Sequence, residues 1–171
     1  MSNLYDEQIE RIIELALTED VSCGDITSQI LILPEQNRRA SITAGESGIL
    51  AGGDVARQVF LKVEPKIEVD VLIADGKGIK TGDRVITVVG DATGILKAER
   101  VALNFMGHLS GIASNTAEYV ARIKNSTAVI RDTRKTLPGM RILEKYAVQL
   151  GGGQNHRLHL GDGILIKDNH I

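Results

Sequence analysis

The segment that begins at Thr127 constrains the fold most, because strand and helix patterns alternate along it. A run rich in β-branched residues covers 128–132, a helical pattern covers 140–150, and a second apolar run covers 163–167. Pro138 lies just before the helical pattern and Gly151 just after it, where each residue type is favoured. This order predicts one βαβ unit, whose right-handed crossover makes the two strands parallel.

The carboxyl ends of two parallel strands lie at the same edge, where barrels and open α/β sheets keep their binding sites. Thr133, Arg134 and Lys135 follow the first predicted strand, while Lys167 and His170 stand at the end of the second. A parallel sheet needs more than two strands and helices on both faces. We therefore expect the rest of a barrel or sheet to be missing from these 171 residues or to come from another chain.

Residues 1–110 predict a different, N-terminal α+β layer. The expected elements are a helix over 5–19, a loop over 20–28, strands over 40–44, 67–73 and 84–90, and a helix over 54–63. A further helical pattern covers 98–124, and we expect an interruption near Ser110 and Gly111 because a continuous helix of this length would be long for a small domain. It would connect the first domain to a second one over 125–171.

Composition excludes several classes of protein. Apolar residues make up 43% of the chain, which is enough for a core, and the net charge is -2. Lys and Arg occur in runs no longer than pairs and aromatic residues are 3%, so we expect no nucleic-acid binding. Cys23 is the single cysteine, which excludes an intrachain disulfide and favours a reducing cytoplasm. We expect neither export nor membrane insertion, because no signal-peptide pattern or long apolar stretch is present.

Cationic and imidazole side chains gather in three short motifs between Arg131 and Ile171. The motifs cover 132–139, 151–157 and 166–170. An Arg guanidinium offers a planar fork for a carboxylate, whereas a Lys ammonium is a point charge that suits phosphate. The three motifs together predict a receptor for a small, highly charged anion.

Each of these residues also has a plainer interpretation. Arg134 with Lys135 could form an exposed basic turn, the three glycines before Gln154 a flexible connection, and Lys167 a solvated strand end. Arg100 reads as a solvated helix charge. We assign the remaining histidines, His108 and His159, to packing or surface, and four scattered histidines do not predict a metal site.

The whole chain resembles the quinolinate phosphoribosyltransferase family. The resemblance is carried, in order, by residues 17–20 with 24–27, by 99–104, by 132–139, by 155–158 and by 165–170. It implies an N-terminal α+β sandwich followed by the start of an incomplete α/β barrel, as in type II phosphoribosyltransferases. It also implies that quinolinate and phosphoribosyl pyrophosphate, with magnesium, give nicotinate mononucleotide, pyrophosphate and carbon dioxide in NAD biosynthesis.

The resemblance assigns roles to seven residues. The positions that it implies for substrate binding are Arg100, Thr133, Arg134, Lys135, His156, Arg157 and Lys167, and among these Lys135 and Lys167 are the catalytic pair. Arg134, His156, Arg157 and Lys167 would hold the quinolinate carboxylates, and Lys135 would face the phosphoribosyl donor. Arg100 would reach the site of the neighbouring subunit, so the resemblance implies a homodimer.

The resemblance also places the acids that organise magnesium beyond residue 171. We therefore expect no metal ligand in this chain, and poor turnover or none by the 171 residues alone. Two alternatives stay open. One is a noncatalytic anion-binding fragment or paralogue, and the other is the related molybdenum-transport-associated protein, although the intact Thr133–Lys135 turn favours quinolinate chemistry.

Overall fold

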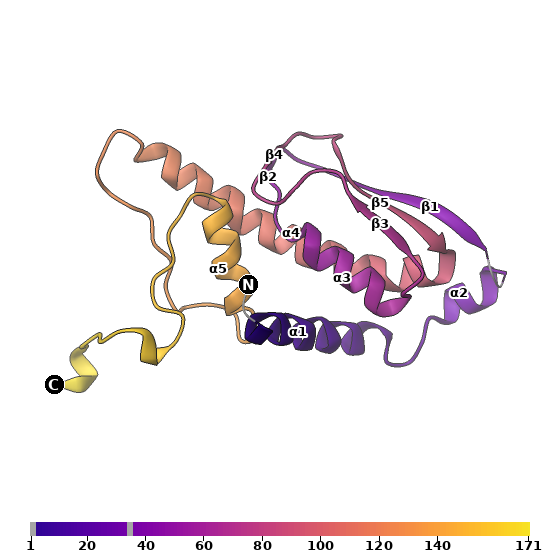
Figure 1. The fold of residues 1–171 in the computed structure, drawn as a ribbon, viewed down its shortest axis with the longest axis horizontal. Coiled ribbons are helices and arrows are strands. Elements are labelled where there is room, and N and C mark those ends of the chain that lie inside the picture. Colours follow the sequence, from indigo (N-terminus) through magenta and orange to yellow (C-terminus); the bar gives the residue numbers. More distant parts are fainter. Residues whose placement is uncertain (1–2, 34–35) are drawn as a thin grey trace.

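The computed structural model describes residues 3–33 and 36–171, whose arrangement is shown in Figure 1. The helices and strands are α1 (Asn3–Val21), α2 (Ile26–Leu31), β1 (Asn37–Thr43), β2 (Gly48–Ile49), α3 (Gly53–Val63), β3 (Glu68–Val71), β4 (Gly78–Ile79), β5 (Arg84–Asp91), α4 (Ala92–Arg122) and α5 (Arg141–Leu150). Short 3-10 helices follow at Leu160–Asp162 and Asp168–His170. Within the described ranges, no helix combines the length and apolar character needed to cross a bilayer.

The central strand of the main sheet is β5, which pairs antiparallel with β1 on one side and β3 on the other. Its residues Val85, Ile86 and Val88 are buried because the sheet is covered by helices. A second, two-stranded ladder joins β2 to β4. The predicted strands over 40–44, 67–73 and 84–90 are thus confirmed as β1, β3 and β5.

Helices α3 and α4 lie side by side against the sheet, and their apolar faces supply most of the core (Figure 1). Phe60 of α3 and Leu109 of α4 are almost completely buried. The N-terminus of α4 follows β5 directly, and the Asp91 carboxylate caps it by accepting from the Gly94 N–H at 2.8 Å. The predicted helices over 5–19 and 54–63 are confirmed as α1 and α3.

The predicted interruption of α4 near Ser110 is wrong, because the helix runs through 31 residues. Ser110 Oγ accepts from the Ala51 N–H at 2.9 Å and donates to the Ala51 carbonyl at 3.1 Å. Ser114 Oγ likewise accepts from the Ile49 N–H at 2.8 Å. These serines bond to a neighbouring segment instead of competing for their own helix backbone, and the buried Leu109 and Ala113 hold the helix in place.

The predicted loop over 20–28 is also partly wrong, because α2 begins at Ile26. The Asp25 carboxylate caps α2, accepting from the Ser28 N–H at 2.9 Å and from the Ser28 hydroxyl. The hydroxyl bond and then the N–H bond lower the pKa of Asp25 below its ordinary value. The capping signal was present in the sequence, but a helix of 6 residues carries too short a pattern to show periodicity.

The predicted βαβ unit forms only in part. Its first strand is reduced to an isolated parallel bridge between Arg131 and Gln154, and residues 163–167 form no strand. Ile164 in that segment is 96% exposed. Figure 1 shows the C-terminal segment extending away from the sheet and helices. A strand needs a neighbour for its backbone hydrogen bonds, and within the described ranges no strand lies beside 163–167.

Candidate anion-binding site

Two cationic segments of the second half lie beside each other. We call residues 132–136 the first arm and residues 154–158 the second arm. Short backbone hydrogen bonds join them: the Gln154 N–H donates to the Ile130 carbonyl at 2.9 Å, and the Asp132 N–H donates to the Gln154 carbonyl at 3.2 Å. The backbone at the start of the first arm therefore lies beside the backbone at the start of the second.

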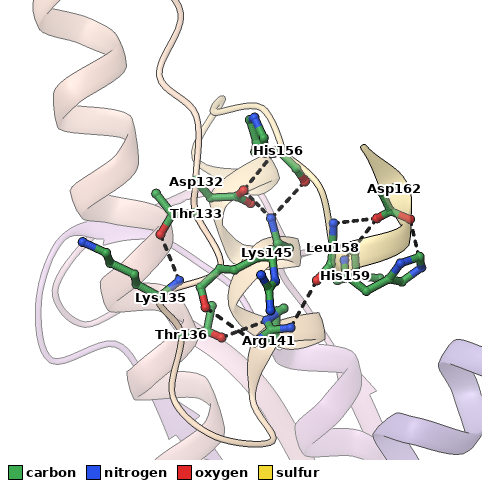
Figure 2. Close-up of polar contacts among 11 residues, drawn as sticks. Asp132, Thr133, Lys135, Thr136, Arg141, Lys145, His156, Leu158, His159 and Asp162 are labelled. Atoms are coloured by element: carbon green, nitrogen blue, oxygen red, sulfur yellow. Dashed lines mark hydrogen bonds and ion pairs between the residues drawn. The ribbon is translucent and has the colours of Figure 1, made fainter. Parts of the chain in front are cut away.

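A buried ion pair lies between the arms (Figure 2). Lys145 of α5 donates to the Asp132 carboxylate, and the two side chains are only 3% and 7% exposed. The Lys145 ammonium also donates to the His156 carbonyl at 3.0 Å, while Asp132 Oδ1 accepts from the His156 N–H at 2.8 Å. Both backbone groups of His156 are thus bonded to the pair, and its imidazole is left at the surface.

Asn155, which is itself exposed, adds hydrogen bonds to this ion pair. With its amide oriented to satisfy its neighbours, its nitrogen donates to Asp132 Oδ2 at 2.7 Å and to the Lys145 carbonyl at 3.0 Å. Its oxygen then accepts from Gln149 Nε2 at 3.2 Å. Asp132 therefore binds donors on both carboxylate oxygens, as a buried charge requires.

Arg141, at the start of α5, makes a second connection between the arms (Figure 2). Its Nε donates to Thr136 Oγ1 at 3.1 Å, and its Nη2 approaches the Arg134 carbonyl at 3.5 Å. On the other side, Nη1 donates to the Leu158 carbonyl at 3.2 Å. The Arg141 guanidinium donates to backbone and hydroxyl oxygens of both arms. It therefore holds the arms in place and is not assigned to anion binding.

The first arm presents two cations. Thr133 Oγ1 accepts from the Lys135 N–H at 3.0 Å and so fixes the turn. Figure 2 shows the Lys135 side chain pointing away from the buried pair, and this residue is exposed. Arg134 is half-buried, and its Nε is a buried donor that finds no hydrogen-bond partner among the described residues. Such an unsatisfied donor is costly, and an acceptor from a ligand would relieve the cost.

The second arm continues into a tight turn. Arg157 Nη1 donates to the Gly163 carbonyl at 3.0 Å, and Asp162 Oδ2 accepts from the Leu158 N–H at 2.7 Å. Burial acts to raise the pKa of Asp162, but the N–H groups of Leu158 and His159 outweigh it, and the pKa lies below its ordinary value. Arg157 therefore has one guanidinium nitrogen committed to the turn.

Two predicted site residues lie outside the arms. Arg100 is exposed on α4, and Lys167 is exposed in the C-terminal segment, where its N–H donates to His170 Nδ1 at 3.1 Å. No hydrogen bond or ion pair joins either side chain to the arms within the described part of the chain. Of the seven predicted residues, Thr133, Arg134 and Lys135 lie on the first arm, and His156 and Arg157 lie on the second.

Sequence reasoning missed the residues that hold the arms together. Asp132 and Asn155 stand in the cationic motifs but were assigned no role, and Arg141 and Lys145 lie outside those motifs. A usable signal was present, because Arg141 and Lys145 are four residues apart and share one helix face. Polar, cationic residues on the inner face of a helix suggest partners on the segments that it covers.

The glycines at 151–153 serve packing. A Cβ on Gly151 would lie 2.3 Å from the Ala113 carbonyl oxygen, and a Cβ on Gly153 would lie 2.9 Å from Thr116 Cγ2. Gly152 has a φ of 85°, in the left-handed region. From the sequence, these glycines were interpreted either as a flexible connection or as a place where backbone approaches a ligand. In the structure, Gly151 lies against the backbone of α4.

Two contacts fix α5 to the N-terminal part. His108 Nε2 of α4 lies 3.0 Å from Glu144 Oε1. Tyr146 Oη donates at 2.9 Å to Asp75, which also accepts from two N–H groups at the start of α3. Burial first, and then the Asp75 charge, raises the pKa of Tyr146 far above its ordinary value. The helix that carries Arg141 and Lys145 is therefore anchored to the rest of the fold.

A cavity of about 330 Å³ opens beside this anchor, between α1, α3 and α5. Lys145, Asn155 and His156 line one side of it, and Tyr146 and Asp75 line another. The described residues contain no group of three or more His, Cys, Asp or Glu side chains that could hold a metal ion.

Comparison with protein families gives two matches. The model for "Quinolinate phosphoribosyl transferase, N-terminal domain" matches residues 25–110, and the model for its C-terminal domain matches residues 112–171. The two matches meet within α4.

Comparison with curated proteins gives relatives that are longer than this chain. This chain is 46% identical over 162 residues to the nicotinate-nucleotide pyrophosphorylase [carboxylating] of Mycobacterium leprae, and the match covers 93% of this chain and 57% of that protein. It is 42% identical over 164 residues to a probable enzyme of the same name from Bacillus subtilis, covering 96% and 56%. The chain thus spans less than two thirds of the length of these relatives.

Comparison with solved structures confirms the predicted fold class. The nicotinate-nucleotide pyrophosphorylase of Francisella tularensis superposes with a TM-score of 0.91 at 38% identity, covering 96% of this chain and 59% of that one. Human nicotinic acid phosphoribosyltransferase is more distant, with a TM-score of 0.58 at 13% identity, and shares the fold alone.

Proposed function

The chain belongs to the quinolinate phosphoribosyltransferase family, and on that basis we propose that the whole protein transfers a phosphoribosyl group from phosphoribosyl pyrophosphate to quinolinate, with loss of carbon dioxide. The product would be nicotinate mononucleotide, an intermediate of NAD biosynthesis. The relatives' names state this carboxylating or decarboxylating chemistry for those proteins. We propose the cytoplasm as the compartment, since the exposed Cys23 thiol is compatible with a reducing environment.

The observation that carries the proposal is the pair of joined cationic arms. Quinolinate has two adjacent carboxylates, so it needs donors from two directions at a fixed spacing. Arg134 offers a guanidinium with an unpartnered Nε from the first arm, and His156 and Arg157 stand on the second. Guanidinium forks bind carboxylates through paired, charge-assisted hydrogen bonds.

This arrangement would also discriminate against nicotinate. A ligand with one carboxylate would leave the donors of one arm unpaired, and it would lose the charge-assisted hydrogen bonds that a second carboxylate makes there. The selectivity would therefore follow from the number and placement of charges. Lys167 of the C-terminal segment would add to the same pocket.

The proposed reaction is a substitution followed by a decarboxylation. Held by its carboxylates, quinolinate would direct its ring nitrogen at the anomeric carbon, where the new N–C bond forms as the bond to pyrophosphate breaks. The ring then carries a positive nitrogen, which stabilises the electron pair left on the adjacent ring carbon when its carboxylate departs as carbon dioxide, and that carbon then takes up a proton. No covalent enzyme nucleophile is needed.

Lys135 is the described cation best placed for the donor. It is exposed, points away from the buried pair, and as an ammonium suits a phosphate oxygen. We propose that magnesium enters with the pyrophosphate of the donor, as this ion commonly does. The described residues offer no acidic cluster for it, so no step is assigned to the metal.

We also propose a homodimer in which Arg100 enters the site of the neighbouring subunit. Arg100 is exposed on α4 and makes no ion pair within the described ranges, so its guanidinium is available to another chain. The charge that it would add suits a ligand with two carboxylates.

Calorimetric titration with quinolinate, with nicotinate as competitor, tests the proposed function. The chain is expected to bind quinolinate selectively, and Arg134→Ala is expected to weaken binding ten-fold or more, since a hydrogen bond to a charged group contributes about 1.5–3 kcal/mol. Arg122→Ala is the matched control, because Arg122 lies over the Tyr119 ring at the end of α4. Equal binding of quinolinate by the protein and by Arg134→Ala would contradict the proposal.

A further inference from the structure

The proposed substrate binding does not explain why a lysine stands at position 145. Its ammonium is buried, and all the contacts described above are internal: the Asp132 carboxylate and the His156 carbonyl. A buried ion pair seldom stabilises a fold more than apolar residues of the same size would, because both charges must leave water. The pair therefore calls for an explanation other than stability.

The position of the pair suggests that explanation. Asp132 is the first residue of the first arm, and its Oδ1 holds the His156 N–H of the second arm at 2.8 Å. Lys145 holds the carbonyl of the same residue at 3.0 Å. The distance between the arms is thus fixed at His156 by two bonds of opposite direction.

Arg141 repeats this arrangement one helical turn earlier. It bonds to Thr136 Oγ1 in the first arm and to the Leu158 carbonyl in the second. Arg141 and Lys145 share one face of α5, so a single rigid element holds both arms at two points. Tyr146 bonds to Asp75, which accepts from two N–H groups at the start of α3, and Glu144 contacts His108 of α4, so that element is anchored to the rest of the fold.

We infer that Lys145, through Asp132, is a positioning residue that sets the separation of the two arms and so makes the site select ligands with two carboxylates. The inference rests on the proposed function, since quinolinate is the ligand considered. Lys145 touches no substrate in this account. A ligand that engages both arms at once depends on their separation, whereas a ligand that engages one arm does not.

The test uses two variants of the chain. Lys145→Met removes the ammonium but keeps the length of the side chain, and it leaves the Asp132 carboxylate buried without its cation. Lys145→Met combined with Asp132→Asn also removes that stranded charge and retains an acceptor for the His156 N–H, so it is the variant that keeps its fold. Lys62→Met is the matched control, because Lys62 pairs with Glu10 and Glu14 at 2.7 and 2.6 Å, far from the arms in sequence.

Two measurements are made on each protein. The first is hydrogen exchange of the arm amides, which needs no ligand: in both Lys145 variants, protection is expected to fall at residues 132–136 and 154–158 and to persist in α3 and α4. The second is the ratio of quinolinate to nicotinate affinity by calorimetry. Loss of a group that orients a metal-binding residue typically costs about 10–100-fold in affinity, and a loss of this order is expected here for quinolinate only.

The outcomes separate the inference from the proposed function. Unchanged arm protection, or a selectivity ratio equal to that of Lys62→Met, would overturn the inference even if the protein binds quinolinate well. Failure of the unmodified chain to bind quinolinate would overturn the proposed function and the selectivity part of the inference. The exchange measurement would then still decide whether Lys145 holds the arms.

Discussion

At the scale of single residues, Gly151 shows how one missing side chain fixes the place of α5. Its position against α4 leaves no space for a Cβ, because the Ala113 carbonyl oxygen would lie only 2.3 Å away. The obstacle is helix backbone, which cannot rotate aside as a flexible side chain can. The close approach of α5 to α4 therefore depends on glycine at this position.

Gly151→Ala is expected to destabilise the protein by about 1–3 kcal/mol, the usual cost of overpacking. Gly107→Ala is the matched control, since Gly107 is exposed within α4 and nothing lies within 4 Å of its added Cβ. That change should stabilise by about 0.5–1 kcal/mol, because alanine is the better helix former. Chemical denaturation measures both, and similar effects of the two substitutions would contradict the packing account.

The Tyr146 hydroxyl should make the unfolding free energy of the protein depend on pH. Burial and the Asp75 charge raise the pKa of Tyr146 in the folded state above its ordinary value of 10.0, so the folded protein keeps this proton after the unfolded chain has lost it. The contribution to stability is complete below pH 10.0 and is lost as the pH rises above it. The unfolding free energy of Tyr146→Phe should therefore fall less steeply in this range than that of the unmodified protein.

The control for this measurement is Tyr119→Phe, because Tyr119 is 52% exposed. Its slope of unfolding free energy against pH should match that of the unmodified protein. Equal slopes for Tyr146→Phe and the unmodified protein would show that the phenol of Tyr146 is not held protonated by the fold.

At the scale of elements, α4 joins the two halves of the molecule. It packs on α3 and the main sheet at one end and on α5 at the other. Its side chains Ser110 and Ser114 also hydrogen-bond the backbone of 49–51. The helix is therefore part of the core, and it also packs against the glycine turn at 151–153 that precedes the second arm.

Ser110→Ala should destabilise the protein by about 1–3 kcal/mol, because the N–H and carbonyl of the completely buried Ala51 would both lose their partner. Ser47→Ala, at an exposed loop position, is the control and should change stability little. Thermal unfolding compares them. A Ser110→Ala protein as stable as the control would mean that water replaces the hydroxyl at no cost.

The elements also show what local sequence patterns can predict. The periodicity of apolar residues located α1, α3 and the three strands of the main sheet, because each of these elements buries one face against other elements of the fold. It failed for 163–167, where an apolar run has no strand beside it among the described residues. It also placed a break in α4, because the partner of Ser110 lies 59 residues away and no local pattern reports it.

In the candidate site, too, the sequence predicts some residues and not others. The cations that would meet the ligand could be found from sequence, since Arg134, Lys135, His156 and Arg157 stand in short motifs. For the buried connections, the spacing of Arg141 and Lys145 on one helix face was a signal, but their partners could not be found, because the Lys145 to Asp132 pair depends on how α5 packs between two loops.

At the scale of the whole molecule, the proposed dimer would share each site between two chains. Mixing Arg100→Ala chains with Arg134→Ala chains should then restore quinolinate binding that neither variant shows alone. In a mixed dimer, one site combines an intact Arg134 with an intact Arg100 from the partner, and the other site lacks both. Random pairing makes about half of the dimers mixed, so about a quarter of all sites should recover.

Binding stoichiometry by calorimetry checks this expectation. Mixing either variant with itself under the same conditions is the control and should restore nothing. Absence of recovery in chains shown to exchange subunits would place Arg100 outside the neighbouring site.

The central claim is that two arms held together by α5 bind the two carboxylates of quinolinate. The most direct measurement is NMR of the arginine and histidine side chains during titration with quinolinate. We expect the signals of Arg134, His156 and Arg157 to shift together and to saturate at one quinolinate per chain, while nicotinate moves them less. Shifts confined to exposed arginines outside the arms, such as Arg38 and Arg122, or shifts of one arm without the other, would contradict it.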